Sequence, residues 1–325
     1  MGSLWKLNNI QNKSVSAENV FNEDFQRRGF GGLVMLVQQI ANGLTLGMVY
    51  ALIAVGYSLV FGILRLVNFS HGSVYAFGAH AAMLLVSMNF GFFPAFLLSI
   101  AFTGLLGIMI DKFALAPLRA KKSKGIAALI TTIGISYIIQ NALMISFGSH
   151  TKFFPKLFDY GNINIAGVSF SSTQIFIFAV SLFLLIALSA VIRFTKIGLA
   201  MRAVEQNQKA AYLMGIDVNK VITFTFFLGG ASAAIAGTLI SGYYQVVYPH
   251  MGFLAGLKAF SAAVLGGIGI LYGSIFGGLV VGVSESMAAS YIGGSYRDAV
   301  AFLILIIVLL LKPTGLFGKK GITKV

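Results

Sequence analysis

The sequence predicts an all-α integral membrane protein, a polytopic bundle of about 8 to 9 transmembrane helices with broken or re-entrant segments. Of its 325 residues, 58% are hydrophobic and only 10% are charged, and the mean hydropathy is +0.89. A soluble domain would have too few charges to cover its surface. Long stretches also lack Asp, Glu, Lys and Arg, and most of them exceed the roughly 20 residues that a helix needs to cross the hydrocarbon.

Hydropathy and proline positions together place the expected spans. All five prolines, Pro94, Pro117, Pro155, Pro249 and Pro313, fall in predicted loops or at span ends, as an unbroken helical hydrogen-bond ladder requires. The expected spans are 33–62, 70–88, 93–112, 126–147, 173–193, 220–241, 255–271, 273–291 and 297–312. They form one membrane domain over residues 31–318, preceded by a polar tail at 1–30 and followed by a basic tail at 319–325.

Basic residues are concentrated in three segments, 111–124, 193–220 and 312–324, which hold 14 of the 23 lysines and arginines. Such clustering is typical of cytoplasmic loops, so the charge indicates topology and not nucleic-acid binding. Residues 148–172 and 241–253 are then expected outside. The N-terminus is also expected outside if the first three spans cross fully.

The chain has no cysteine, so thiolate catalysis and Cys-ligated metal sites are excluded. Its four histidines are isolated, and no phosphate-binding loop, H-E-x-x-H pair or G-x-S-x-G elbow occurs. We therefore expect no metal, no cofactor and no enzymatic activity. If transport is driven, a partner or an ion gradient must supply the energy.

A dense polar group, Asn68-Phe69-Ser70-His71-Gly72, interrupts an apolar stretch. Unsatisfied polar groups are costly in hydrocarbon, so Asn68, Ser70 and His71 could line a polar path for a solute. Alternatively, Asn68 or Ser70 caps a helix start and His71 is a satisfied interhelical residue. A second Gly-interrupted region lies at 265–282, and broken helices in both halves of a chain are typical of transporters.

Glu285 is the clearest acid inside a predicted span. Intramembrane acids are costly and often functional, so it could line a polar route or relay protons. It could equally be neutralised by Lys258 or Arg297, or lie close enough to an interface to be solvated. The glycine pairs at 229–230, 266–267 and 277–278 most simply allow close helix packing.

Residues 198–217 lie between two spans and predict a short amphipathic helix. Ala200, Ala203, Val204, Ala211 and Met214 share one stripe, and Gly215 stands where a left-handed C-terminal cap is favoured. Such a helix could dock in a groove of a partner or lie on lipid headgroups.

These segments resemble the permease subunits of branched-chain amino-acid (Liv-type) ABC importers. The resemblance runs from about residue 38 to 318, and its most specific parts are at 42–72, 198–216, 258–282 and the closing KPTGLFG at 312–318. Where many importer coupling loops have Glu before paired Ala, this chain has Lys209 before Ala210 and Ala211.

The resemblance implies a permease of the bacterial cytoplasmic (inner) membrane that imports leucine, isoleucine and valine. Its expected partners are a second permease subunit, two cytoplasmic ATPase subunits, an extracytoplasmic solute-binding protein and membrane lipid. By resemblance, the helix that couples to the ATPase comprises Met201, Arg202, Ala203, Glu205, Lys209, Ala210, Ala211, Met214, Gly215 and Ile216. Related importers carry urea, short amides or sugars, and an ion-coupled secondary transporter using Glu285 is the alternative from another class.

Overall fold

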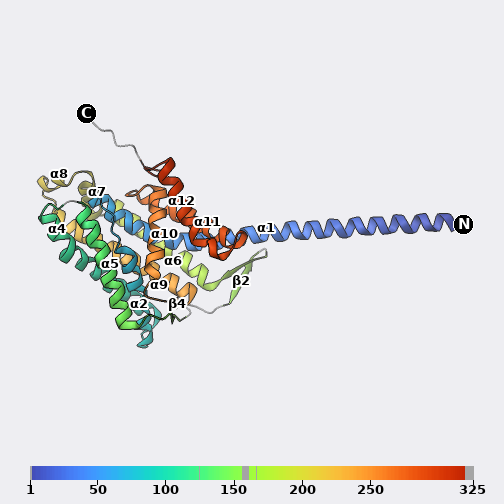
Figure 1. The fold of residues 1–325 in the computed structure, drawn as a ribbon, viewed down its shortest axis with the longest axis horizontal. Coiled ribbons are helices and arrows are strands. Elements are labelled where there is room, and N and C mark those ends of the chain that lie inside the picture. The colour runs from blue at the N-terminus through green and yellow to red at the C-terminus, as the bar shows by residue number, and fades with distance from the viewer. Residues whose placement is uncertain (1, 124, 156–160, 166, 319–325) are drawn as a thin grey trace.

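The computed structural model describes the backbone of residues 2–123, 125–155, 161–165 and 167–318, and side chains within these ranges from residue 32 onward. The predicted basic tail at 319–325 lies outside the described residues. The described residues form a helical fold with four short strands (Figure 1). In chain order the elements are α1 (Gly2–Leu64), α2 (His71–Ser87), α3 (Phe92–Met109), the π-helix η1 (Ile110–Leu115), α4 (Ala116–Ala120), α5 (Gly125–Phe147), β1 (Lys152–Phe153), β2 (Asn162–Ile165), β3 (Val168–Ser171), α6 (Ser172–Phe194), α7 (Lys196–Gln206), α8 (Gln208–Leu213), α9 (Val218–Tyr244), β4 (Val246–Val247), α10 (Met251–Gly266), α11 (Leu271–Tyr291), the 3-10 helix η2 (Gly294–Tyr296) and α12 (Arg297–Leu311).

Each expected span corresponds to a helix of the structure, which confirms the predicted fold class. Seven helical segments in the described part of the chain are long and apolar enough to cross a membrane. They are 32–64 of α1, 92–120 across α3 to α4, α5, α6, α9, α11 and 294–311 across η2 and α12. The other two expected spans are shorter, with 17 residues in α2 and 16 in α10.

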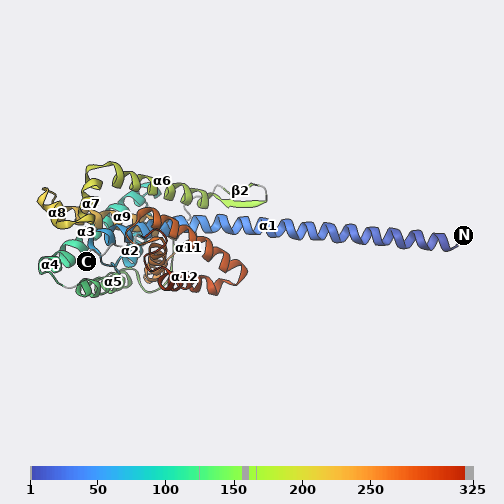
Figure 2. The same ribbon diagram turned by 90° about the horizontal axis from the view of Figure 1, so that it is seen from above.

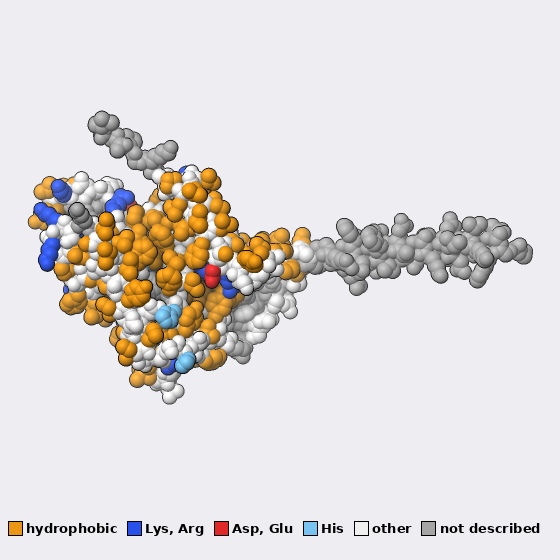
Figure 3. Space-filling model, viewed as in Figure 1, with side chains coloured by type: hydrophobic (Ala, Val, Ile, Leu, Met, Phe, Trp, Pro, Cys, Tyr) orange, Lys and Arg blue, Asp and Glu red, His pale blue; other side chains and the backbone are white. Residues whose placement is uncertain are grey.

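The core lies around α1 and α9. In the most apolar window of α1, 89% of the residues are buried, against 17% in α6 and 11% in α12. Figures 1 and 2 place α1 along the long axis of the molecule, with α11 beside it and α6 on another side. The outer helices expose rows of Leu, Ile and Phe to the surroundings (Figure 3), as lipid-facing helices do.

Glycines set the closest helix contacts. A Cβ atom built on Gly282 of α11 would lie 2.3 Å from the Gly47 Cα atom of α1, so only glycine lets these backbones approach so closely. At the α10–α11 corner, a Cβ on Gly266 would lie 1.9 Å from the Gly273 carbonyl oxygen. The glycine pairs at 266–267 and 277–278 therefore serve close packing, as the sequence predicted.

Two breaks interrupt the bundle at the positions expected from the sequence. Residues 65–70 separate α1 from α2, and 267–270 separate α10 from α11. Because His71 at the start of α2 contacts Ile53, several turns before the end of α1 at Leu64, the chain after the first break folds back along α1 into the bundle. In the second break, Gly267 and Gly269 have φ values of +104° and +91°, a left-handed region that glycine adopts without strain.

The described parts of the three basic segments, which for the third are residues 312–318, gather at one end of the bundle. Asp111 beside α3 bonds Thr223 of α9 there, and Leu316 N donates to the Leu265 carbonyl. In Figure 3, Lys and Arg side chains are grouped over the end that holds α4, α7 and α8 in Figure 1. At the opposite end β1 pairs antiparallel with β4, with Lys152 opposite Val247. The structure thus places the two loops predicted to lie outside on one side, away from the three basic segments.

Candidate functional site

The segment at 198–217 forms two helices and not the single helix predicted. The break is at Asn207, whose backbone is extended with φ −158° and ψ 107°. Its Oδ1 atom accepts hydrogen bonds from the backbone N–H groups of Lys209 (3.0 Å) and Ala210 (3.1 Å), so it caps a new helix, α8. After α8, Gly215 has φ +86°, which confirms the predicted left-handed C-terminal cap.

The break also changes which side chains point inward. On the predicted stripe, Val204 and Ala211 are buried and Ala200 and Ala203 are half-buried. Met201, which was not on that stripe, is buried as well. Met214, expected on the same stripe, is 83% exposed, because the turn at Asn207 ends the helical phase that began in α7. Together with Tyr212 (71% exposed) and Leu213 (83% exposed), it forms an apolar α8 tip at the basic end of the molecule.

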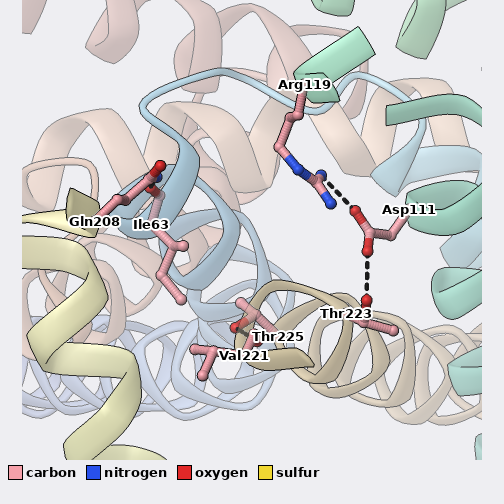
Figure 4. Close-up of polar contacts among 7 residues, drawn as sticks. All are labelled: Ile63, Asp111, Arg119, Gln208, Val221, Thr223 and Thr225. Atoms are coloured by element: carbon pink, nitrogen blue, oxygen red, sulfur yellow. Dashed lines mark hydrogen bonds and ion pairs between the residues drawn. The ribbon is translucent and has the colours of Figure 1, made fainter. Parts of the chain in front are cut away.

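Hydrogen bonds tie this segment to the ends of the membrane helices, and Figure 4 shows one of the residues involved, Gln208, beside Ile63. The Gln208 Nε2 atom donates to the Ile63 carbonyl at the end of α1 (2.8 Å). Arg202 Nη1 donates to the carbonyl oxygens of Ile192 (2.5 Å) and Arg193 (3.0 Å), which closes the corner between α6 and α7. These hydrogen bonds therefore connect α7 and α8 to the ends of α6 and α1.

A buried acid lies beside the same region. Asp111 in η1 is fully buried, and its two carboxylate oxygens accept hydrogen bonds from Arg119 Nη1 (2.5 Å) and Thr223 Oγ1 (2.6 Å). Figure 4 shows this chain of contacts between η1, α4 and the start of α9. A salt-bridged and hydrogen-bonded carboxylate in a buried place fixes these three elements relative to one another.

Glu205 of α7 faces an inner cavity of roughly 730 Å³ between the ends of α1, α6 and α7 and the break at 267–270. Burial raises the pKa of Glu205, and Arg65 nearby opposes part of that shift. Asp217 caps α9 by accepting from the Lys220 backbone N–H (3.1 Å). The hydrogen bonds from Lys220 lower the pKa of Asp217.

The polar interruption at 68–72 is buried and internally bonded. Asn68 Oδ1 accepts from the Ser70 N–H (3.1 Å) and from Ser70 Oγ (2.6 Å), so it stabilises the turn before α2. His71 Nε2 donates to the Ile53 carbonyl (3.2 Å), and its ring packs edge-on against Tyr57 at 4.6 Å. His71 is thus a satisfied interhelical residue, as the alternative predicted, whereas Ser70 stands at the N-cap position of α2 without a side-chain cap hydrogen bond.

Glu285 lies 1% exposed in a cluster of charged residues. Its Oε1 atom lies 2.9 Å from Lys258 Nζ and 3.0 Å from Arg297 Nε. Lys258 Nζ also lies 2.6 Å from Asp298 Oδ1. The expectation that Lys258 or Arg297 neutralises Glu285 agrees with this geometry, since both cations contact the same oxygen atom.

A family model described as "Branched-chain amino acid transport system / permease component" matches residues 39–309. The chain belongs to this family. Among individual proteins, the permease is 42% identical to the high-affinity branched-chain amino acid transport system permease protein BraD of Pseudomonas aeruginosa, over 89% of this chain and 98% of BraD. It is 39% identical to LivH of Escherichia coli, over 89% of this chain and 97% of LivH. The ribose import permease RbsC of Haemophilus influenzae is more distant, at 26% identity over 87% of each chain.

The family and the seven apolar helices confirm the prediction of a multi-pass protein of the cytoplasmic membrane. The family is a transport component, so the permease is not itself an enzyme.

Sequence reasoning missed two buried or clustered acids in the permease. Asp298 joins the Glu285 cluster although it lies at the start of the last helix. Asp111 was grouped with the cytoplasmic basic residues, whereas it is buried against Thr223. The sequence could have indicated that both acids are paired, because each one borders a long uncharged run and is close in sequence to a cation.

Proposed function

We propose that this chain is the transmembrane permease subunit of an ATP-driven importer for the branched-chain amino acids leucine, isoleucine and valine. ATP is hydrolysed on two separate cytoplasmic subunits, a second permease completes the membrane part, and an extracytoplasmic binding protein delivers the solute. The family match and the similarity to BraD and LivH, two high-affinity branched-chain amino acid permeases, support this choice of solute. The observation that best supports the ATPase contact is the apolar α8 tip.

The α8 tip is built for contact with another protein. Tyr212, Leu213 and Met214 are exposed at the end of the bundle that holds the basic segments, which faces the cytoplasm by the positive-inside rule. Consecutive exposed apolar residues away from the lipid-facing helices are typical of a docking surface. A cleft of the ATPase subunit is the occupant we propose, with Lys209 and Ala210 on the first turn of α8 beside it.

Force applied to the α8 tip reaches the bundle through short contacts. Gln208 at the start of α8 bonds the last turn of α1, and α1 is the most buried span. The contacts of Asp111 with Arg119 and Thr223 hold η1 and α4 against α9, so the cytoplasmic ends of α3 and α9 move as one unit. Closure of the ATPase subunits would then tilt these helices and alternate access to the solute path.

For the solute path we propose Glu285 as a lining residue in the outer half of the bundle. Asn68, Ser70 and His71 contribute by fixing where α2 begins inside the bundle. The glycine contact between the starts of α2 and α10 supports this role, because a Cβ on Gly252 would lie 2.0 Å from the Gly72 carbonyl oxygen. A shift of residues 68–71 would therefore displace both short helices.

The test is leucine uptake into proteoliposomes that contain this chain with or without its partner subunits. We expect ATP-dependent accumulation only with the ATPase subunits and binding protein present. Accumulation by this chain alone, lost on adding an ionophore and in Glu285→Gln, would reject the proposal in favour of an ion-coupled transporter. ATP-dependent uptake of urea, short amides or ribose in place of leucine would leave the assignment as an ATP-driven importer standing and reject leucine as its solute.

A further inference from the structure

The Glu285 cluster forms part of the wall of a cavity of roughly 270 Å³ at the outer end of the bundle. The cavity lies between α1, α2, α9, α10, α11 and the start of α12, and β4 borders it. Its volume is just below the roughly 300 Å³ at which pockets for drug-sized ligands begin, so it suits a small solute.

The charges in this wall balance, but one buried acceptor has no donor. Lys258 and Arg297 face Glu285 and Asp298, so two formal positive charges meet two negative ones. Both cations approach Glu285 Oε1. Tyr50 also interacts with this carboxylate, yet among the described residues neither the buried Oε2 atom of Glu285 nor the buried Nε atom of Arg297 has a partner that meets hydrogen-bond geometry. Buried carboxylate oxygens are normally satisfied, so Oε2 is an open position for a donor from a ligand.

The rest of the cavity wall is aromatic and aliphatic. Four tyrosines, Tyr50, Tyr75, Tyr244 and Tyr248, line it together with Ile240, Val246, Met251 and Leu254. Lys258 Nζ lies 5.8 Å from the centre of the Tyr50 ring, and the Arg297 guanidinium lies 5.6 Å from that of Tyr244. Cations are therefore already held against the tyrosine faces, where an ammonium group is also favoured.

We infer that this cavity is a binding site for an aliphatic α-amino acid inside the subunit itself. The ammonium group of the solute donates to Glu285 Oε2, the carboxylate meets Lys258 or Arg297, and the side chain lies against Met251 and Leu254. Because the solute is a zwitterion, it enters a charge-balanced cluster without adding net charge, which keeps the electrostatic cost of burial low. The inference rests on the proposed function for the identity of the solute.

The cluster is reachable from the outer end. The side chains of Asp298 and Arg297 are 43% and 33% exposed, whereas those of Lys258 and Glu285 are 8% and 1% exposed. The exposed fraction of the charged side chains thus decreases from the rim of the cavity to its floor. A solute arriving from outside meets Asp298 and Arg297 first and then Glu285.

The test measures how fast a single introduced thiol is modified, which is possible because this chain has no native cysteine. Ala255→Cys places one thiol in the cavity lining, and Phe253→Cys, 65% exposed on the same helix and outside the lining, is the matched control. In the assembled complex in nanodiscs, leucine should slow modification of the thiol at 255 by a small reagent and leave that at 253 unchanged. The keto acid 4-methyl-2-oxopentanoate, which has the same carbon skeleton and no ammonium group, should need about 10- to 100-fold higher concentration.

In Glu285→Gln this preference for leucine over the keto acid should disappear. If Glu285→Gln fails to assemble, Lys258→Gln combined with Glu285→Gln keeps the charges balanced and serves the same purpose. Equal protection by both compounds in the native background, or a preference that survives both variants, overturns the inference. Normal leucine uptake without protection of residue 255 rejects this site alone, whereas absence of leucine uptake rejects the proposed function as well.

Discussion

Leu213 at the α8 tip offers a direct test of docking. The residue is 83% exposed in this chain, and Leu213→Ala removes three carbons. At about 0.8 kcal/mol per buried methylene, complete burial against a partner would make this change cost about 2.4 kcal/mol, and the exposed share accounts for about 2 kcal/mol. Since 1.4 kcal/mol is a factor of ten, the ATPase subunit should bind roughly 30-fold more weakly. Equilibrium binding to the chain in nanodiscs measures this loss.

Ile145→Ala is the matched control for Leu213→Ala. Ile145 lies on α5, is 87% exposed and loses the same number of carbons, but it is near the opposite end of the bundle. Both variants should unfold within about 0.5 kcal/mol of the native chain, because exposed positions contribute little to stability. If Leu213→Ala binds the ATPase subunit within twofold of the native chain, the α8 tip is not the docking surface.

Three further variants test packing, charge and pH dependence. Gly282→Ala should overpack the contact with α1 at a cost of about 1–3 kcal/mol and so lower the thermal unfolding midpoint. Gly134→Ala, with open space around it, should leave the midpoint unchanged. Equal midpoints for the two variants would contradict the contact between Gly282 and α1. Lys258→Met should cost about 3 kcal/mol of stability and regain most of it when combined with Glu285→Met; an additive loss in the double variant would show that the two residues do not act as a pair. Glu205→Gln should be more stable than the native chain at neutral pH, because the raised pKa of Glu205 in the folded state means that its ionisation opposes folding. The stability difference between the two chains should shrink as the pH falls through that pKa. A difference in unfolding midpoint that does not change with pH would refute this reasoning.

Most of the fold could be predicted because a membrane helix has a local sequence pattern, a long apolar run without charge. A run of apolar residues without charge must form a helix in lipid, so hydropathy gives the spans and the loops between them. The breaks before His71 and after Gly266 were visible as polar or glycine interruptions. The pairing of β1 with β4 was not predictable, since these strands come from distant parts of the chain and pair through backbone contacts that leave no local pattern.

The candidate sites were less predictable because they depend on tertiary contacts. The division of 198–217 into α7 and α8 follows from Asn207, whose side chain competes with the helix for backbone N–H groups. The pairing of Glu285 with Lys258 could be anticipated from their isolation in apolar stretches. The contact of Lys258 with Asp298 could not, because it requires α10 and α12 to pack together.

The central claim is that the α8 tip faces the cytoplasm and receives the ATPase subunit. In this chain without native cysteine, Leu213→Cys gives a single thiol there. Its reaction with a membrane-impermeant maleimide should occur in inside-out vesicles, be absent in intact cells, and be blocked once the ATPase subunits are bound. Labelling in intact cells, or labelling that bound ATPase subunits do not slow, would contradict the account.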